Sequence, residues 1–130
     1  MNDRHWTVED HLDNKPAASI ALFRQIEQEV LRRGDVRVSV SKTTVTFKGS
    51  RRGFFGARPT KTGVDGYFDI MRSLGTDDKR IRRISPYQHN LFVHQYRLES
   101  AADLDDDFLS WLREAYGVGN GAHLQGGASG

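Results

Sequence analysis

Basic side chains with aromatic residues between them are the feature of this sequence best suited to chemistry, and that chemistry is the binding of phosphate groups. Residues 32–83 carry 14 Lys and Arg against 5 Asp and Glu, a net charge of +9. Residues 1–31 carry a net charge of −3 and residues 84–130 one of −4. Cations hold phosphates and aromatic rings stack on bases, so the pattern is compatible with binding of nucleic-acid strands.

Four cations are the candidates for contact with nucleic acid or another polyanion: Arg51, Arg52, Arg58 and Lys61. Arg51 and Arg52 are expected at the tip of a hairpin, where they would be exposed. The opposing interpretation is that acidic helices neutralise the basic strands within the fold and that the aromatic residues form the core. The sequence leaves both interpretations open.

A second candidate site surrounds His94. Alternate side chains of a strand share a face, so His94 is expected to lie on one face with Phe92, Tyr96 and Leu98. A histidine in that position can transfer a proton or bind an anion in a pocket. It can equally be a histidine at the edge of the core that is hydrogen-bonded to a neighbour.

No residues predict a catalytic centre, a metal site or a cofactor site. Without cysteine there are no disulfides and no thiolate zinc sites. The spacing of His5, Asp10 and His11 fits no standard metal site. Asp105–Asp107 would point in different directions along a helix, and the helix dipole explains them better. Glycine-rich phosphate loops and the nucleophile elbow are absent, so a binding protein is favoured over an enzyme.

The chain is expected to be cytoplasmic and to have no membrane partner. No apolar run approaches the roughly 20 residues that span a bilayer. The first residues are polar and lack the pattern of a signal peptide. The absence of cysteine suits a reducing compartment.

Helices are expected near both ends of the chain. Thr7 and Asp10 have the spacing of a capping box, and Pro16 suits the first position of a longer helix that ends at Gly34. Ser100 and Asp103 repeat the capping-box spacing before a helix that continues to about Gly117.

The middle of the chain alternates with period two, which predicts short strands. They are expected near residues 36–40, 45–47, 53–58, 64–70, 80–85 and 90–98, with turns at 41–43, 60–63 and Pro86. The short connections predict an α+β fold, with an antiparallel sheet of about five to six strands and the N- and C-terminal helices on one face. Residues 1–119 would form one domain, and 120–130 a disordered Gly- and Ser-rich tail.

Five segments, taken in order, resemble a bacterial family: Trp6–Leu12, Ser41–Thr43 with Phe47, Arg58-Pro59, Val93-His94 with Arg97-Leu98, and Trp111–Tyr116. That family is the domain of unknown function with the number 5655, and the resemblance covers about residues 5–117. Its relatives also occur fused within larger proteins, some of which resemble restriction or nuclease-associated components. The resemblance therefore implies an accessory or binding role and carries no catalytic residues.

Three functions remain open. The first is a non-enzymatic module that binds nucleic acid or another polyanion through a basic sheet surface. The second is a small-molecule or enzymatic pocket between the sheet and the N-terminal segment. Its lining would be the polar residues of the segments that carry the resemblance: Lys42, Thr43, Arg58, His94 and Arg97. The third is a protein–protein interaction domain, which could include self-association.

Overall fold

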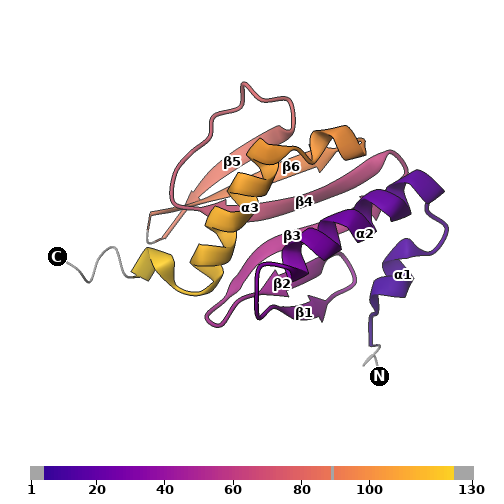
Figure 1. The fold of residues 1–130 in the computed structure, drawn as a ribbon, viewed down its shortest axis with the longest axis horizontal. Helices are drawn as coiled ribbons and strands as arrows, with labels where there is room; N and C mark the ends of the chain where they lie inside the picture. Colours follow the sequence, from indigo (N-terminus) through magenta and orange to yellow (C-terminus); the bar gives the residue numbers. More distant parts are fainter. Residues whose placement is uncertain (1–4, 89, 125–130) are drawn as a thin grey trace.

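Six antiparallel strands form one sheet, and helices cover one of its faces (Figure 1). The structure is a computed structural model that describes residues 5–88 and 90–124. The order across the sheet is β1-β2-β3-β4-β6-β5. The strands are β1 (Arg37–Val40), β2 (Val45–Lys48), β3 (Gly53–Thr60), β4 (Gly63–Ile70), β5 (Ile81–Tyr87) and β6 (Leu91–Leu98). The predicted α+β fold is confirmed.

The helices come from both ends of the chain, as expected: α1 (Val8–Leu12), α2 (Ala17–Leu31), the single 3-10 turn η1 (Ala101–Asp103) and α3 (Asp106–Gly119). The capping box of α1 forms, because Thr7 Oγ1 accepts from Asp10 N at 3.2 Å and Asp10 Oδ2 accepts from Thr7 N at 2.9 Å. Both α2 and α3 pack on β3 and β4. The opposite face of the sheet carries no helix of the described residues, and we call it the open face (Figure 1).

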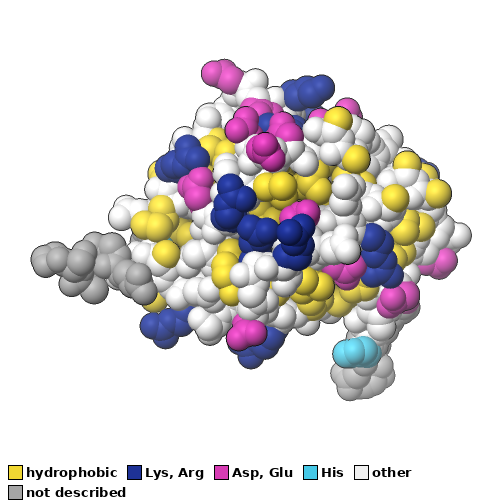
Figure 2. Space-filling view, viewed as in Figure 1, with side chains coloured by type: hydrophobic (Ala, Val, Ile, Leu, Met, Phe, Trp, Pro, Cys, Tyr) yellow, Lys and Arg dark blue, Asp and Glu magenta, His cyan; other side chains and the backbone are white. Residues whose placement is uncertain are grey.

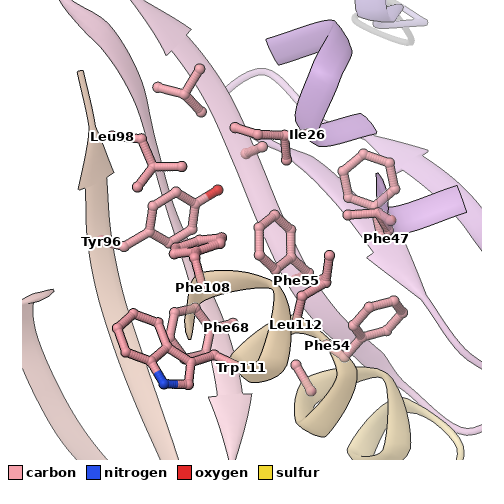
Figure 3. Close-up of a cluster of buried hydrophobic side chains, with 14 of the residues drawn as sticks. Ile26, Phe47, Phe54, Phe55, Phe68, Tyr96, Leu98, Phe108, Trp111 and Leu112 are labelled. Carbon is pink, nitrogen blue, oxygen red and sulfur yellow. The ribbon is translucent and has the colours of Figure 1, made fainter. Parts of the chain in front are cut away.

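Aromatic side chains fill the layer between the sheet and the helices (Figure 3). Phe55 on β3 is opposite Phe68 on β4, and both rings meet Phe108 of α3 edge-on. Tyr96 is fully buried among them and donates its hydroxyl hydrogen to the Gly56 carbonyl at 2.9 Å. The interleaved aromatics on the helix side of the sheet are therefore core residues.

Two local predictions differ from the structure. Pro86 lies within β5 rather than at a turn, which is tolerated because β5 is an edge strand with no partner on its outer side. The capping box at Ser100 opens only η1, and a separate N-cap, Asp105, opens α3 by accepting from Phe108 N at 3.0 Å. The local capping signal therefore located the start of η1 and missed the separate start of α3.

The expected tail is only partly described. The side chain of Asn120, the C-cap of α3, accepts from Ser50 N at 2.8 Å and so meets the β2–β3 hairpin. The described chain continues to Leu124, and residues 125–130 lie outside the described residues.

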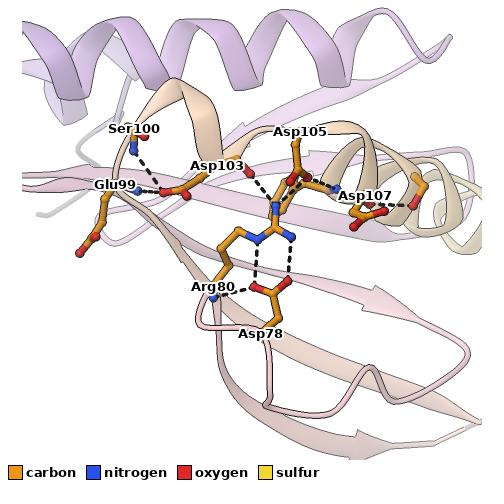
Figure 4. Close-up of polar contacts among 9 residues, drawn as sticks. Asp78, Arg80, Glu99, Ser100, Asp103, Asp105 and Asp107 are labelled. Atoms are coloured by element: carbon orange, nitrogen blue, oxygen red, sulfur yellow. Dashed lines mark hydrogen bonds and ion pairs between the residues drawn. The ribbon is translucent and has the colours of Figure 1, made fainter.

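Basic and acidic side chains are interspersed on the helix-bearing face, with apolar groups between them (Figure 2). Acidic side chains gather at its upper edge in that view. One cation near the start of α3 is nearly buried. The guanidinium of Arg80 binds the Asp78 carboxylate through two nitrogens, and its Nη1 donates to Asp105 at 2.7 Å and to the Asp103 carbonyl at 2.8 Å (Figure 4).

Candidate anion-binding site

Two neighbouring hollows share the side chain of Arg58 at one end of β3. The larger, which we call the sheet groove, has a volume of about 590 Å³. Its polar lining is Thr43, Thr44, Arg58, Asp65, Tyr67, Arg82, Gln95 and Arg97. The smaller, which we call the N-terminal pocket, has a volume of about 350 Å³. It is lined by Trp6, Asp10, His11, Lys15, Lys42, Arg58, Pro59 and Thr60.

Glycine shapes the floor of the sheet groove. The ring of Tyr67 lies across Gly56, where a Cβ atom would stand 2.3 Å from ring carbon Cε1. Burial raises the pKa of Tyr67, and a hydrogen bond with Thr46 partly opposes that shift. The phenol is therefore a neutral donor at physiological pH, and its partly exposed ring offers a flat apolar surface on the open face.

The charges of the sheet groove follow from strand register. Arg58 on β3 pairs with Asp65 on β4, which pairs in turn with Arg97 on β6. Asp65 accepts two hydrogen bonds from Arg97, at 2.9 and 3.2 Å, whereas Arg58 is 3.9 Å away and its side chain is 50% exposed. Arg82 is exposed and forms no ion pair within the described chain. Three guanidinium groups thus line the groove with one carboxylate. Arg97 is hydrogen-bonded to that carboxylate, whereas Arg58 and Arg82 are not.

The N-terminal pocket is built by a contact between α1 and the turn that precedes β2. His11 Nε2 is 2.8 Å from the Ser41 carbonyl, which can only accept, so Nε2 donates. The Ser41 hydroxyl accepts from Thr43 N and Thr44 N, which forms the predicted turn. Lys42 lies within that turn, so His11 holds the backbone next to a lysine of the pocket.

His94 is placed on the other side of the sheet and lines neither hollow. Its Nε2 accepts from Leu74 N at 3.1 Å, and its Nδ1 donates to the Phe92 carbonyl at 3.0 Å. The ring stacks on Phe68 with centroids 5.0 Å apart, and burial lowers the pKa of His94. It is a neutral core histidine that holds the segment after β4. The other expected pocket residues divide between the hollows: Thr43, Arg58 and Arg97 line the groove, and Lys42 and Arg58 the pocket.

The four candidate cations lie toward two ends of β3. Arg58 and Lys61 are near the β3–β4 turn, and Arg51 and Arg52 are near the β2–β3 hairpin, about 20 Å away along the strand. Arg52 forms an ion pair with the buried carboxylate of Asp69. Desolvation raises the pKa of Asp69, and the charge of Arg52 opposes that shift. Of the four candidate cations, Arg58 lines both hollows, whereas the other three line neither.

The lining residues that sequence reasoning did not assign to either candidate site include two aromatic residues and two cations: Trp6, Tyr67, Lys15 and Arg82. Tyr67 is one of the aromatic residues that the opposing interpretation places in the core. Strand alternation could have separated Tyr67 from its core neighbour Phe68, since the two must face opposite ways. No local signal links Lys15 to Arg58.

No three His, Asp or Glu side chains of residues 5–88 and 90–124 are placed to share a metal ion. None of the helices there is long and apolar enough to cross a membrane.

The comparisons with known proteins give one match. A family model described as "Domain of unknown function (DUF5655)" matches residues 8–119. No curated protein and no solved structure matches the chain. The matched span runs from the start of α1 to the end of α3, so it contains every residue of the two hollows except Trp6.

Proposed function

The chain belongs to the DUF5655 family, and we propose that it is a non-enzymatic module that binds nucleic acid or another polyanion through the sheet groove and the adjoining N-terminal pocket. We propose the bacterial cytoplasm as the place where it acts, since a chain without cysteine suits a reducing compartment. The observation that carries the proposal is the position of Arg58, which joins two hollows that both have more cations than carboxylates.

The chemistry of the groove supports a strand as the ligand. Arg58 and Arg82 are exposed enough to reach phosphates without leaving a buried partner unpaired. Tyr67 offers a ring on which a base can stack, and Gln95 offers amide groups for base edges. The groove is lined by side chains of the open face, which the helices leave uncovered (Figure 1). A strand can therefore approach without displacing any element of the described fold.

Binding of this kind depends on salt. If three cations neutralise three phosphates of a single strand, the slope of log K against log salt concentration is about −2, from about −0.7 per phosphate. Affinity would then fall about twentyfold between roughly 50 and 200 mM salt. Removal of Arg58 should reduce the steepness of the slope by about 0.7.

The test is fluorescence anisotropy with labelled single-stranded DNA, single-stranded RNA and duplex at several salt concentrations. We expect Arg58→Gln to weaken binding and flatten the salt dependence. The control is Arg32→Gln, which removes the same charge from an exposed arginine at the end of α2 that lines neither hollow and pairs with Glu29. The proposal fails if the protein shows no salt-sensitive binding at low ionic strength, or if the two variants behave alike.

A further inference from the structure

Three cations from separate parts of the chain converge on the N-terminal pocket. Lys15 follows α1, Lys42 lies in the turn before β2, and Arg58 lies on β3. Within the described chain neither lysine forms an ion pair, and Arg58 has one ion-pair partner there, Asp65, which is 3.9 Å away in the sheet groove. Bringing like charges together costs free energy, which a bound anion would offset. The fold itself gains nothing evident from placing them around one hollow.

The single carboxylate of the pocket does not neutralise this set. Asp10 Oδ2 accepts from the amide and hydroxyl of Thr7 at 2.9 and 3.1 Å, so it caps α1. Three positive charges therefore face one negative charge that is already engaged. The surplus suits a ligand group that carries two negative charges.

Rigid elements hold the pocket in this shape. The hydrogen bond from His11 to the Ser41 carbonyl fixes α1 against the turn that carries Lys42. Pro59, buried beside Arg58, restricts the backbone of β3 at the pocket wall. Trp6 provides an aromatic side chain at the same hollow.

The charge of the pocket distinguishes between kinds of phosphate. An internal phosphodiester carries one negative charge, whereas a phosphomonoester carries about −1.5 to −2 at neutral pH and has three strong acceptor oxygens. We infer that the N-terminal pocket binds a phosphomonoester. On a nucleic acid this group is a terminal phosphate, and the shared Arg58 would connect it to the strand in the sheet groove. That placement on a strand rests on the proposed function, while the pocket itself could also take a free phosphorylated small molecule.

The experiment compares one short single-stranded oligonucleotide in three forms: with a 5′-phosphate, with a 3′-phosphate, and with hydroxyl groups at both ends. Adenosine monophosphate and adenosine are the small-molecule probes. Binding is followed by anisotropy and by amide chemical shifts of Thr7–Leu12 and Ser41–Thr44. We expect one phosphorylated form to bind about tenfold more tightly than the hydroxyl form, with shifts in both segments.

Variants link that preference to the pocket. Lys42→Gln should abolish the ratio between phosphorylated and hydroxyl forms, and Lys42→Arg should restore it. Lys61→Gln is the matched control, because Lys61 is an exposed lysine at the same end of the sheet that lines neither hollow. It should weaken all forms alike and keep the ratio. The amide spectrum of each variant checks that it is folded.

The outcomes separate this inference from the proposed function. If the oligonucleotides bind with salt dependence but without preference for a terminal phosphate, the inference is wrong and the proposed function stands. If no oligonucleotide binds while adenosine monophosphate, and not adenosine, shifts the pocket amides in wild type but not in Lys42→Gln, the proposed function is wrong and the pocket binds free phosphomonoesters. If no probe binds, both are wrong.

Discussion

Replacing Arg80 by methionine tests what holds α3 to the segment after β4. Arg80 is 7% exposed, and its guanidinium makes bidentate hydrogen bonds to Asp78 and donates to Asp105 and to the Asp103 carbonyl. It also lies over the ring of Trp111, 4.8 Å from its centroid. Methionine keeps the aliphatic stem and removes every one of these polar contacts, so the substitution isolates the charge.

The expected cost follows from burial on each side of the ion pairs. Removing one partner of a buried pair costs about 3–5 kcal/mol, because the other is left charged and unpaired. Here the carboxylates are partly exposed, 35% for Asp78 and 49% for Asp105, so water can solvate them again. We therefore expect a loss of about 3 kcal/mol in the free energy of unfolding for Arg80→Met, at the low end of that range.

Urea denaturation followed by tryptophan fluorescence and by circular dichroism measures this loss. The matched control is Arg72→Met, because Arg72 also binds a carboxylate of α3 through two nitrogens, that of Glu114. Those side chains are 56% and 37% exposed, and exposed pairs contribute at most about 1 kcal/mol. Equal losses in the two variants would refute the argument from burial.

The same network predicts a pH dependence. The hydrogen bonds from Arg80 lower the pKa of Asp78 to about 2, below its value in the unfolded chain. A depressed folded-state pKa contributes stability above the unfolded value, and that contribution is lost as pH falls toward 2. The difference between wild type and Arg80→Met should therefore shrink as pH falls from about 4 toward 2. A constant difference across that range would contradict the assignment.

Three further predictions concern the core, and urea titrations test each. Burial lowers the pKa of His94, so in the unfolded chain this histidine binds a proton at a higher pH than in the folded protein. The free energy of unfolding should therefore decrease as pH falls below about 6.5, and His94→Gln should remove this pH dependence. Tyr96→Phe leaves the Gly56 carbonyl without its donor and should cost about 1–2 kcal/mol, with a cost near zero contradicting the hydrogen bond. Gly66→Ala should cost more than about 3 kcal/mol, since its Cβ would lie 1.9 Å from the backbone oxygen of Gly56, and a folded variant of normal stability would refute that close approach.

Local rules predicted most of the elements because each depends on neighbours in sequence. The capping boxes at Thr7 and Ser100 formed where their spacing indicated, and the turn at Ser41 explains the change of phase between β1 and β2. Alternation correctly grouped His94 with the apolar side chains of β6. Strand alternation does not indicate that α3 covers this face. The sequence therefore left two possibilities open, a pocket on the sheet and a buried core.

The candidate site was less predictable because its residues meet only through tertiary structure. The pair between Arg58 and Asp65 follows from the expected turn at residues 60–63, since a two-residue turn fixes the register of the strands around it. The next pair, Asp65 with Arg97, does not follow from any turn. It arises because β6 inserts between β4 and β5, and that strand order has no local signal.

Charge pairing decides how the uneven charge of the sequence should be interpreted. If acidic helices neutralised the basic middle, most of its 14 cations would pair with acids of the flanking segments. Only six of them form ion pairs within the described chain: Arg32, Arg33, Arg52, Arg58, Arg72 and Arg80. Four of these reach an acid of the flanking segments: Arg32 and Arg33 pair with Glu29, Arg72 with Glu114, and Arg80 with Asp105. Among residues 5–88 and 90–124, internal neutralisation therefore leaves more than half of these cations without an ion pair, including Lys42 and Arg82, which line the two hollows. A polyanion bound at Arg58 would neutralise these unpaired cations. Variants that remove the cations should lose affinity for the polyanion before they lose stability.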